Sequence, residues 1–186
     1  LLGAGPVKSV LSSDGRTLCI LNERQRTVSF LNTRDNVITG AAQIDQDGQD
    51  LAFSNDNSKI YVVHKSKDKL NIIDTSTKRI IKTLSVPSRP VGLVALRKVD
   101  KIYAITEESN ELLFIDPEDG IKDRVTLSFI PMHLSISPVP DEKLIFIGGR
   151  TLSGYILVVF DRLTKEVKIL SQPDKATLFL LPLYVW

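Results

Sequence analysis

The fold is decided by the stretch Tyr61–Val86, which reads YVVHKSKDKLNIIDTSTKRIIKTLSV. Two apolar runs, at 61–63 and 70–73, flank a polar loop, and a turn at 74–77 leads to a third run at 80–86. Short runs of apolar and β-branched residues between turn residues are typical of β-strands. The stretch therefore predicts three consecutive antiparallel strands.

Similar segments recur along the chain at a fixed period, which is the signature of a repeat protein. The tetrapeptide Ile60–Val63 has counterparts that begin at 18, 102 and 144, each 42 residues after the one before. The next strand (69–74) recurs at 27–32, 111–116 and 156–161. The last interval is longer, and we assign its extra residues to a glycine-rich loop at 148–155. A fourth strand is predicted at 80–86, with looser counterparts at 37–44, 124–130 and 167–171.

The third strand of each repeat is apolar on both of its faces. Because side chains alternate along a strand, one face is formed by Val28 and Phe30, Leu70 and Ile72, Leu112 and Phe114, and Leu157 and Val159. The other face carries Leu31, Ile73, Ile115 and Phe160. A sheet with one solvated face would alternate apolar and polar residues. The pattern therefore predicts an all-β protein in which each four-stranded antiparallel sheet stacks between two others, which is the arrangement of blades in a β-propeller.

The repeat resembles the YVTN-type β-propeller repeat of surface-layer proteins, quinoprotein amine dehydrogenases and cytochrome d1 nitrite reductases. The second copy carries the resemblance best, at 61–63 (YVV), 73–75 (IDT) and Val86, and the third adds 89–92 (RPVG) and 102–103 (IY). The resemblance implies a ring of about seven blades. It also favours a periplasmic, extracellular or cell-surface location, while an organellar one stays open.

The repeats divide the chain into about four and a half blades. We predict a single β-propeller domain or fragment over 1–186, with repeats at 5–46, 47–88, 89–129 and 130–172 and a partial repeat at 173–186. Because an open blade leaves unpaired sheet edges, we expect the chain to be part of a larger ring. A closed four-bladed ring with an extra hairpin is the alternative.

Composition is that of a globular protein without a strong electrostatic preference. Of 186 residues 42% are hydrophobic and 25% charged, and the formal net charge is +2. We therefore expect no nucleic-acid partner and no direct membrane insertion. The single cysteine, Cys19, lies in an apolar run and is predicted to be a buried, unreactive thiol.

The loops between the second and third strands are the predicted partner-binding site. They lie on the same edge of the blades as the connections between repeats, and their charge changes from basic in the first two repeats to acidic in the third. Such a two-sided surface favours docking to a protein partner or a larger assembly. The predicted contact residues are Arg24, Arg26, His64, Lys65, Lys67, Glu107, Glu108 and Arg150.

Other chemistry has weaker support. The acidic segment 45–50 (DQDGQD) resembles a calcium loop but lacks the downstream glutamate of an EF-hand, so we assign it to a connection between blades. Residues Asn32, Asp74, Asp116 and Asp161 are predicted to cap turns. His133 is a candidate haem or metal ligand near the axis of the ring. We expect a non-enzymatic scaffold without catalytic residues, cofactor or metal; the alternative is a redox propeller, related to cytochrome d1 or quinoprotein enzymes, or another propeller enzyme.

Overall fold

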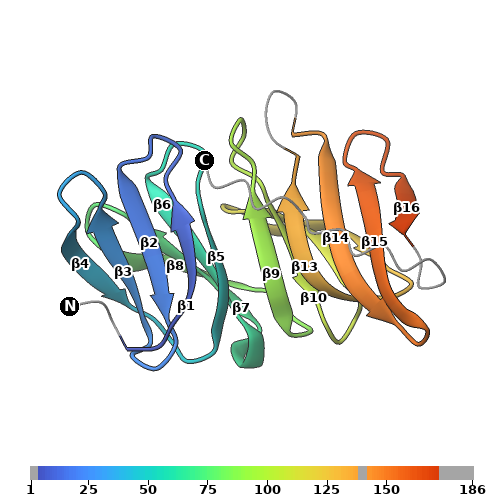
Figure 1. The fold of residues 1–186 in the computed structure, drawn as a ribbon, viewed down its shortest axis with the longest axis horizontal. Helices are drawn as coiled ribbons and strands as arrows, with labels where there is room; N and C mark the ends of the chain where they lie inside the picture. Colours follow the sequence, from blue (N-terminus) through green and yellow to red (C-terminus); the bar gives the residue numbers. More distant parts are fainter. Residues whose placement is uncertain (1–3, 138–141, 172–186) are drawn as a thin grey trace.

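The computed structural model describes residues 4–137 and 142–171, which form four antiparallel sheets of four strands each. We call them blades 1 to 4. Blade 1 contains β1 (Pro6–Leu11), β2 (Thr17–Asn22), β3 (Thr27–Asn32) and β4 (Val37–Gln43); blade 2 contains β5 (Gly48–Phe53), β6 (Lys59–His64), β7 (Lys69–Asp74) and β8 (Arg79–Ser85). Blade 3 contains β9 (Pro90–Ala95), β10 (Ile102–Thr106), β11 (Glu111–Asp116) and β12 (Gly120–Thr126); blade 4 contains β13 (Ile130–Ile136), β14 (Leu144–Thr151), β15 (Gly154–Asp161) and β16 (Val167–Ser171). The strands of each blade pair in chain order (Figure 1).

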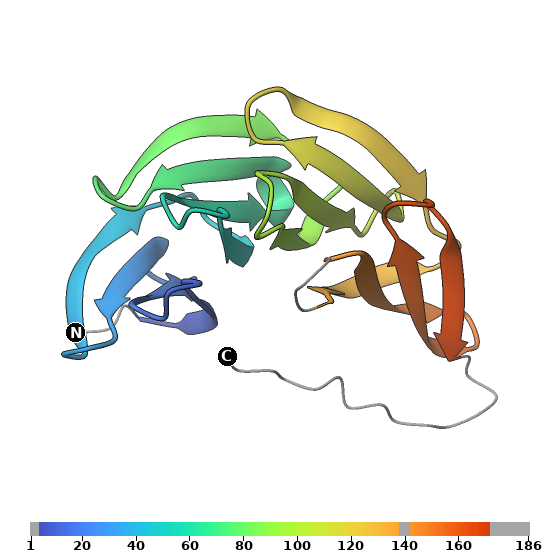
Figure 2. The same cartoon turned by 90° about the horizontal axis from the view of Figure 1, so that it is seen from above.

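The blades stand side by side in an arc, with the first strand of each blade innermost and the fourth outermost (Figure 2). The innermost strands contact one another in sequence, β1 with β5, β5 with β9, and β9 with β13. This arrangement confirms the predicted β-propeller architecture of four-stranded antiparallel blades.

The core lies between the blades, where two apolar faces meet. At the boundary of blades 1 and 2, Val28 and Phe30 pack in one cluster with Ile73. At the next boundary, Leu70 and Ile72 cluster with Ile115 of blade 3. Both faces of β7, the third strand of blade 2, are thus buried, as the sequence pattern predicts. Burial of one such side chain contributes about 1.5–3 kcal/mol, so these boundaries supply much of the stability of the arc.

The polar residue at the end of each third strand caps the following turn. The carboxylate of Asp74 accepts hydrogen bonds from the backbone N–H groups of Ser76 and Thr77, at 3.1 and 2.7 Å. These bonds lower the pKa of Asp74 to about 2. Asn32, Asp116 and Asp161 accept equivalent backbone bonds. The predicted turn caps are therefore confirmed.

Three strand boundaries differ from those that the sequence predicts. The fourth strand of blade 3 is Gly120–Thr126 and not 124–130, because Ile130 already begins β13. The first strand of blade 2 begins at Gly48, three residues before the apolar run at Leu51. The segment 148–155 is not an enlarged loop, since most of it extends β14 and β15 into a longer hairpin. The partial repeat at 173–186 lies outside the described residues.

Contacts between neighbouring first hairpins tie the blades together at the opposite edge from the loops that we predicted as a binding site. The amide of Asn57 donates to the Ser13 hydroxyl at 2.8 Å. The Tyr61 hydroxyl donates to Asp100. Glu142, almost fully buried, accepts the backbone N–H of Arg97 at 2.7 Å. We call this edge, formed by the turns 12–16, 54–58 and 96–101, by Ser137, Glu142 and Lys143 of blade 4, and by the turns after each third strand, the turn face.

Candidate functional site

The loop face is the opposite edge of the arc. It consists of the loops 23–26, 65–68, 107–110 and 152–153 and of the connections between blades at 44–47, 86–89 and 127–129. Backbone hydrogen bonds join the first three loops to connections: Ile44 donates to Arg26 at 2.9 Å, Lys65 to Asp47 at 3.0 Å, and Glu107 to Arg89 at 3.1 Å. The loops are therefore held in place by the fold.

Most of the predicted contact residues lie on the loop face, with different exposure. Arg24, Arg26, Lys67, Glu108 and Arg150 are exposed, and Lys65 and Glu107 are partly buried. Arg150 is a strand residue near the end of β14 and not a loop residue.

His64 is placed wrongly by the sequence prediction. It is the last residue of β6, pairs with Lys69 across the hairpin, and is fully buried. Its Nδ1 lies 3.1 Å from the carbonyl oxygen of Gln46, which belongs to the connection between blades 1 and 2. Burial lowers the pKa of the His64 imidazole, against the effect of that carbonyl. His64 therefore supports the loop from inside and is not presented to a partner.

The acidic third loop is neutralised by basic neighbours. Lys65 Nζ lies 2.7 Å from Glu107 Oε2, so blades 2 and 3 are joined by an ion pair, which lowers the pKa of Glu107. Arg89, which was not among the predicted residues, lies 3.7 Å from Glu107 and 3.8 Å from Glu108. The expected separation into a basic and an acidic side is wrong here, because the two kinds of side chain meet across the blade boundary.

Three exposed cations of the first two loops have no such partner. Within the described residues, Arg24, Arg26 and Lys67 form no ion pair, and Glu23 and Asp68 are exposed acids of the same loops that form none either. Arg24 packs its aliphatic stem against the backbone of Gly5, where a β-carbon would lie 2.8 Å from Arg24 Cγ. The two loops therefore present three unpaired cations against two unpaired acids.

The acidic segment 45–50 sends its carboxylates to separate partners. Asp45 pairs with Lys69, and Asp47 accepts a hydrogen bond from the Ser66 hydroxyl. The assignment to a solvated connection holds for these two residues but is wrong for Asp50, which lies in β5 with 6% of its surface exposed.

Asp50 links three blades. Its Oδ1 accepts the backbone N–H of Leu51 at 2.9 Å and lies 3.2 Å from Lys8 Nζ in blade 1, and its Oδ2 accepts the N–H of Leu93 in blade 3 at 3.1 Å. Burial raises the pKa of Asp50, and Lys8 opposes that rise. Asp50 was not singled out from the sequence, because its polar neighbours suggest a surface connection.

His133 occupies the same place in its blade as Asp50 does in blade 2. The innermost strands share an irregularity in register near their beginning, and the residues that follow it are Lys8, Asp50, Gly92 and His133. His133 is exposed and pairs with Gly148. Its predicted place on an innermost strand is observed; within residues 4–137 and 142–171, no three His, Cys, Asp or Glu side chains are grouped closely enough to hold a metal ion.

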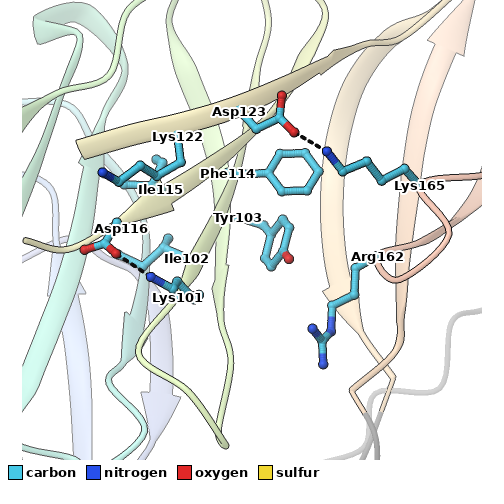
Figure 3. Close-up of a pocket in the computed structure, with 10 residues that line it drawn as sticks. All are labelled: Lys101, Ile102, Tyr103, Phe114, Ile115, Asp116, Lys122, Asp123, Arg162 and Lys165. Atoms are coloured by element: carbon cyan, nitrogen blue, oxygen red, sulfur yellow. Dashed lines mark hydrogen bonds and ion pairs between the residues drawn. The ribbon is translucent and has the colours of Figure 1, made fainter. Parts of the chain in front are cut away.

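A cleft of about 350 Å³ opens at the turn face between blades 3 and 4. Its wall is formed by the Tyr103 and Phe114 rings, whose centroids are 4.9 Å apart and whose planes meet at 63°. Figure 3 shows Lys165 joined to Asp123 on one side of these rings and Arg162 on the other. Lys165 Nζ lies 5.8 Å from the centroid of the Phe114 ring. We call this feature the interblade cleft.

Comparison with known proteins shows the fold. No family model and no curated protein matches the chain. Among solved structures, hydrazine synthase of Kuenenia stuttgartiensis matches with a TM-score of 0.81 and 22% identity, over 91% of this chain and 50% of that one. The WD40 repeats of RRP9 match with a TM-score of 0.76 and 10% identity, over 91% and 52%. Dihydro-heme d1 dehydrogenase NirN, solved in complex with DHE, matches with 0.64 and 14%, over 86% and 36%.

These neighbours are β-propeller proteins, and the chain spans about half the length of the first of them. At such identities the likeness extends to the fold alone. In the described part of the chain no helix is long and apolar enough to span a membrane. The chain is thus similar in fold to β-propellers, and its membership of the YVTN-type family stays an expectation.

Proposed function

We propose that the chain is a non-enzymatic interaction module, which docks a protein partner through the loop face. The partner would carry an acidic patch that covers the loops of blades 1 and 2. The blades serve as a rigid support, and the loops, which differ from repeat to repeat, give the specificity.

The observation that carries this proposal is the group of three exposed cations, Arg24, Arg26 and Lys67, which form no ion pair within the described residues. The loops that carry these side chains are fixed by backbone bonds to the connections between blades. A fixed loop loses little conformational entropy on binding. Opposite charges on a partner would raise the association rate and select the correct orientation. The acids of the third loop are already paired with Lys65 and Arg89, so they offer less to a basic partner.

To test the proposal, the chain is immobilised, and proteins that bind to it at low salt are recovered from an extract of the native cells. Each partner is then purified and titrated against the chain and against a variant with Arg24, Arg26 and Lys67 changed to Glu. We expect the variant to bind at least about tenfold more weakly at low salt, and the difference to shrink as salt increases. The matched control reverses Arg34 and Arg79, which are exposed near the turn face.

Two results would contradict the proposal. One is a partner whose affinity is unchanged in the loop variant or lost equally in the control. The other is binding of a nucleic acid through the same three cations, measured with a short duplex as probe.

A redox propeller with a haem-like cofactor beside His133 is the alternative function. The fold is similar to that of NirN, whose structure was solved in complex with DHE, and His133 is exposed on an innermost strand. If such a cofactor is bound, the purified chain has a visible absorption band that is lost in His133→Ala. Our proposal expects no band that depends on His133.

A further inference from the structure

The boundary of blades 3 and 4, where the interblade cleft lies, differs from the boundary of blades 2 and 3 in the surroundings of one tyrosine. Tyr61 and Tyr103 occupy the same position in the second strands of blades 2 and 3. At the boundary of blades 2 and 3, the Tyr61 hydroxyl donates to Asp100, and Lys59 lies 3.4 Å from Asp100 and 3.6 Å from Glu118. The phenol there is satisfied by a carboxylate of the next blade.

At the boundary of blades 3 and 4 the equivalent carboxylate is engaged elsewhere. Glu142 occupies the place of Asp100, but its two oxygens accept the backbone N–H groups of Arg97 and Lys98, at 2.7 and 3.2 Å. The guanidinium of Arg162 instead lies beside the Tyr103 phenol, where its Nε donates to the Glu142 carbonyl oxygen at 2.7 Å. A cation thus stands at Tyr103 where an anion stands at Tyr61.

This exchange leaves the Tyr103 hydroxyl as a hydrogen-bond donor that faces the cleft. Since a guanidinium has no acceptor to offer, Arg162 can only donate to the phenol oxygen, and the phenol proton is then available to an anion. Burial raises the pKa of Tyr103, so the phenol keeps that proton at neutral pH. Four cationic side chains line the cleft, Lys101, Lys122, Arg162 and Lys165, and the three lysines pair with Asp116, Asp119 and Asp123. A ligand anion can compete for the lysines of such surface ion pairs.

The apolar wall sets the second requirement for a ligand. Phe114 is partly exposed and Tyr103 is 7% exposed, so the apolar surface open to a ligand is mostly that of the Phe114 ring. A flat apolar group can pack on it, because aromatic rings stack favourably. Lys165 spans the Phe114 ring and pairs with Asp123, but both partners are exposed (57% and 44%). Such a pair contributes little, so a ligand anion can replace Asp123 as the partner of Lys165. A cleft of this volume is at the lower end of the range for small-molecule sites, about 300–1,000 Å³.

We propose that the interblade cleft binds a small aromatic carboxylate. The flat ring packs against Tyr103 and Phe114, and the carboxylate accepts from the Tyr103 hydroxyl, from Arg162 and from Lys165. The site is on the turn face, so it is independent of protein docking at the loop face.

The test uses 2-naphthoate as probe and the neutral 2-naphthamide as its comparison, each titrated into isotopically labelled chain and followed by amide chemical shifts. We expect 2-naphthoate to bind saturably, with a Kd on the order of 1 mM, and to shift the amides around Tyr103, Phe114 and Lys165. The amide should bind at least about tenfold more weakly, because it lacks the charge.

The matched variants are Tyr103→Phe, which removes only the hydroxyl, and Tyr61→Phe, which makes the same change at the boundary of blades 2 and 3. We expect Tyr103→Phe to weaken 2-naphthoate by about fivefold or more and 2-naphthamide by less, because a charged acceptor makes the stronger hydrogen bond, and Tyr61→Phe to change neither. Absence of saturable binding, equal affinity for the two probes, or equal effects of the two variants would each overturn the proposal. The Arg24, Arg26 and Lys67 reversal should leave probe binding intact, which separates this site from the loop face.

Discussion

At the residue scale, the blade boundaries differ from one another in single polar side chains. Asp50, Asp100 and Glu142 each reach into the preceding or following blade, and their partners all differ. Buried polar groups of this kind stabilise only when every hydrogen bond is made. They therefore fix how each blade sits against its own neighbours.

The Lys8–Asp50 pair predicts a pH-dependent contribution to stability. The folded pKa of Asp50 lies above its ordinary value, so stability falls as pH rises from that value through the folded pKa. Loss of Lys8 raises the folded pKa further and makes this fall larger. We expect Lys8→Met to lower the free energy of unfolding by about 1 kcal/mol at pH 7.5, a modest effect because Lys8 is half exposed and its attraction to Asp50 is screened by solvent.

At pH 3.5 the same variant should match the original chain, since Asp50 is then protonated with or without Lys8. Urea unfolding at both pH values measures the difference. Lys122→Met is the control, because Lys122 pairs with an exposed aspartate, Asp119. An equal loss of stability at both pH values would contradict this prediction, because it would mean that Lys8 stabilises the fold by packing and not by its charge.

Local rules predict some of these residues and miss others. The turn-capping role of Asp74 follows from the residues next to it, because the cap and the backbone it binds are adjacent in sequence. The burial of His64 depends on the connection at Gln46, and the pairing of Glu107 depends on Lys65 and Arg89 from another blade. Distant partners of this kind cannot be identified from the local pattern.

At the element scale, the strands follow from the repeat except where glycines obscure it. The segment 148–155 contains three glycines and no long apolar run, which suggests a loop. In the structure its pairing continues from Gly148–Leu157 to Thr151–Gly154, so β14 and β15 form the longest hairpin described. The strand is held by backbone hydrogen bonds to β13 and β15, and these leave no pattern of side chains in the sequence.

Gly149 and Gly148 provide a matched test of this hairpin. A β-carbon at Gly149 would lie 2.5 Å from the backbone oxygen of Ile130, which cannot move without disturbing β13. At Gly148 the nearest atom would be His133 Cβ at 3.9 Å, an ordinary contact. We expect Gly149→Ala to destabilise the chain by about 1–3 kcal/mol and Gly148→Ala to change stability little, as measured by urea unfolding. Similar losses in both variants would mean that the close approach to Ile130 does not explain the glycine at 149.

At the scale of the whole molecule, the arc contains two kinds of blade. Blades 2 and 3 each pack between two described neighbours, whereas blades 1 and 4 have one. The same strand position shows the difference: Ile73 and Ile115 are buried, while Leu31, the counterpart in blade 1, is only partly so. The period predicts this stacking, because a strand that is apolar on both faces needs two neighbours.

In stacked repeats, stability is close to a sum of the stability of each unit and of its contacts with adjacent units. We therefore expect amide hydrogens in β6, β7, β10 and β11 to exchange more slowly than those in β2, β3, β14 and β15. Hydrogen exchange of the 186-residue chain, followed by mass spectrometry of its peptides at neutral pH, measures this order. Equal protection of β2–β3 and β6–β7 would mean that the outer face of blade 1 is covered in solution. Repetition at several protein concentrations then shows whether another copy of the chain covers it, because protection by a second copy increases with concentration.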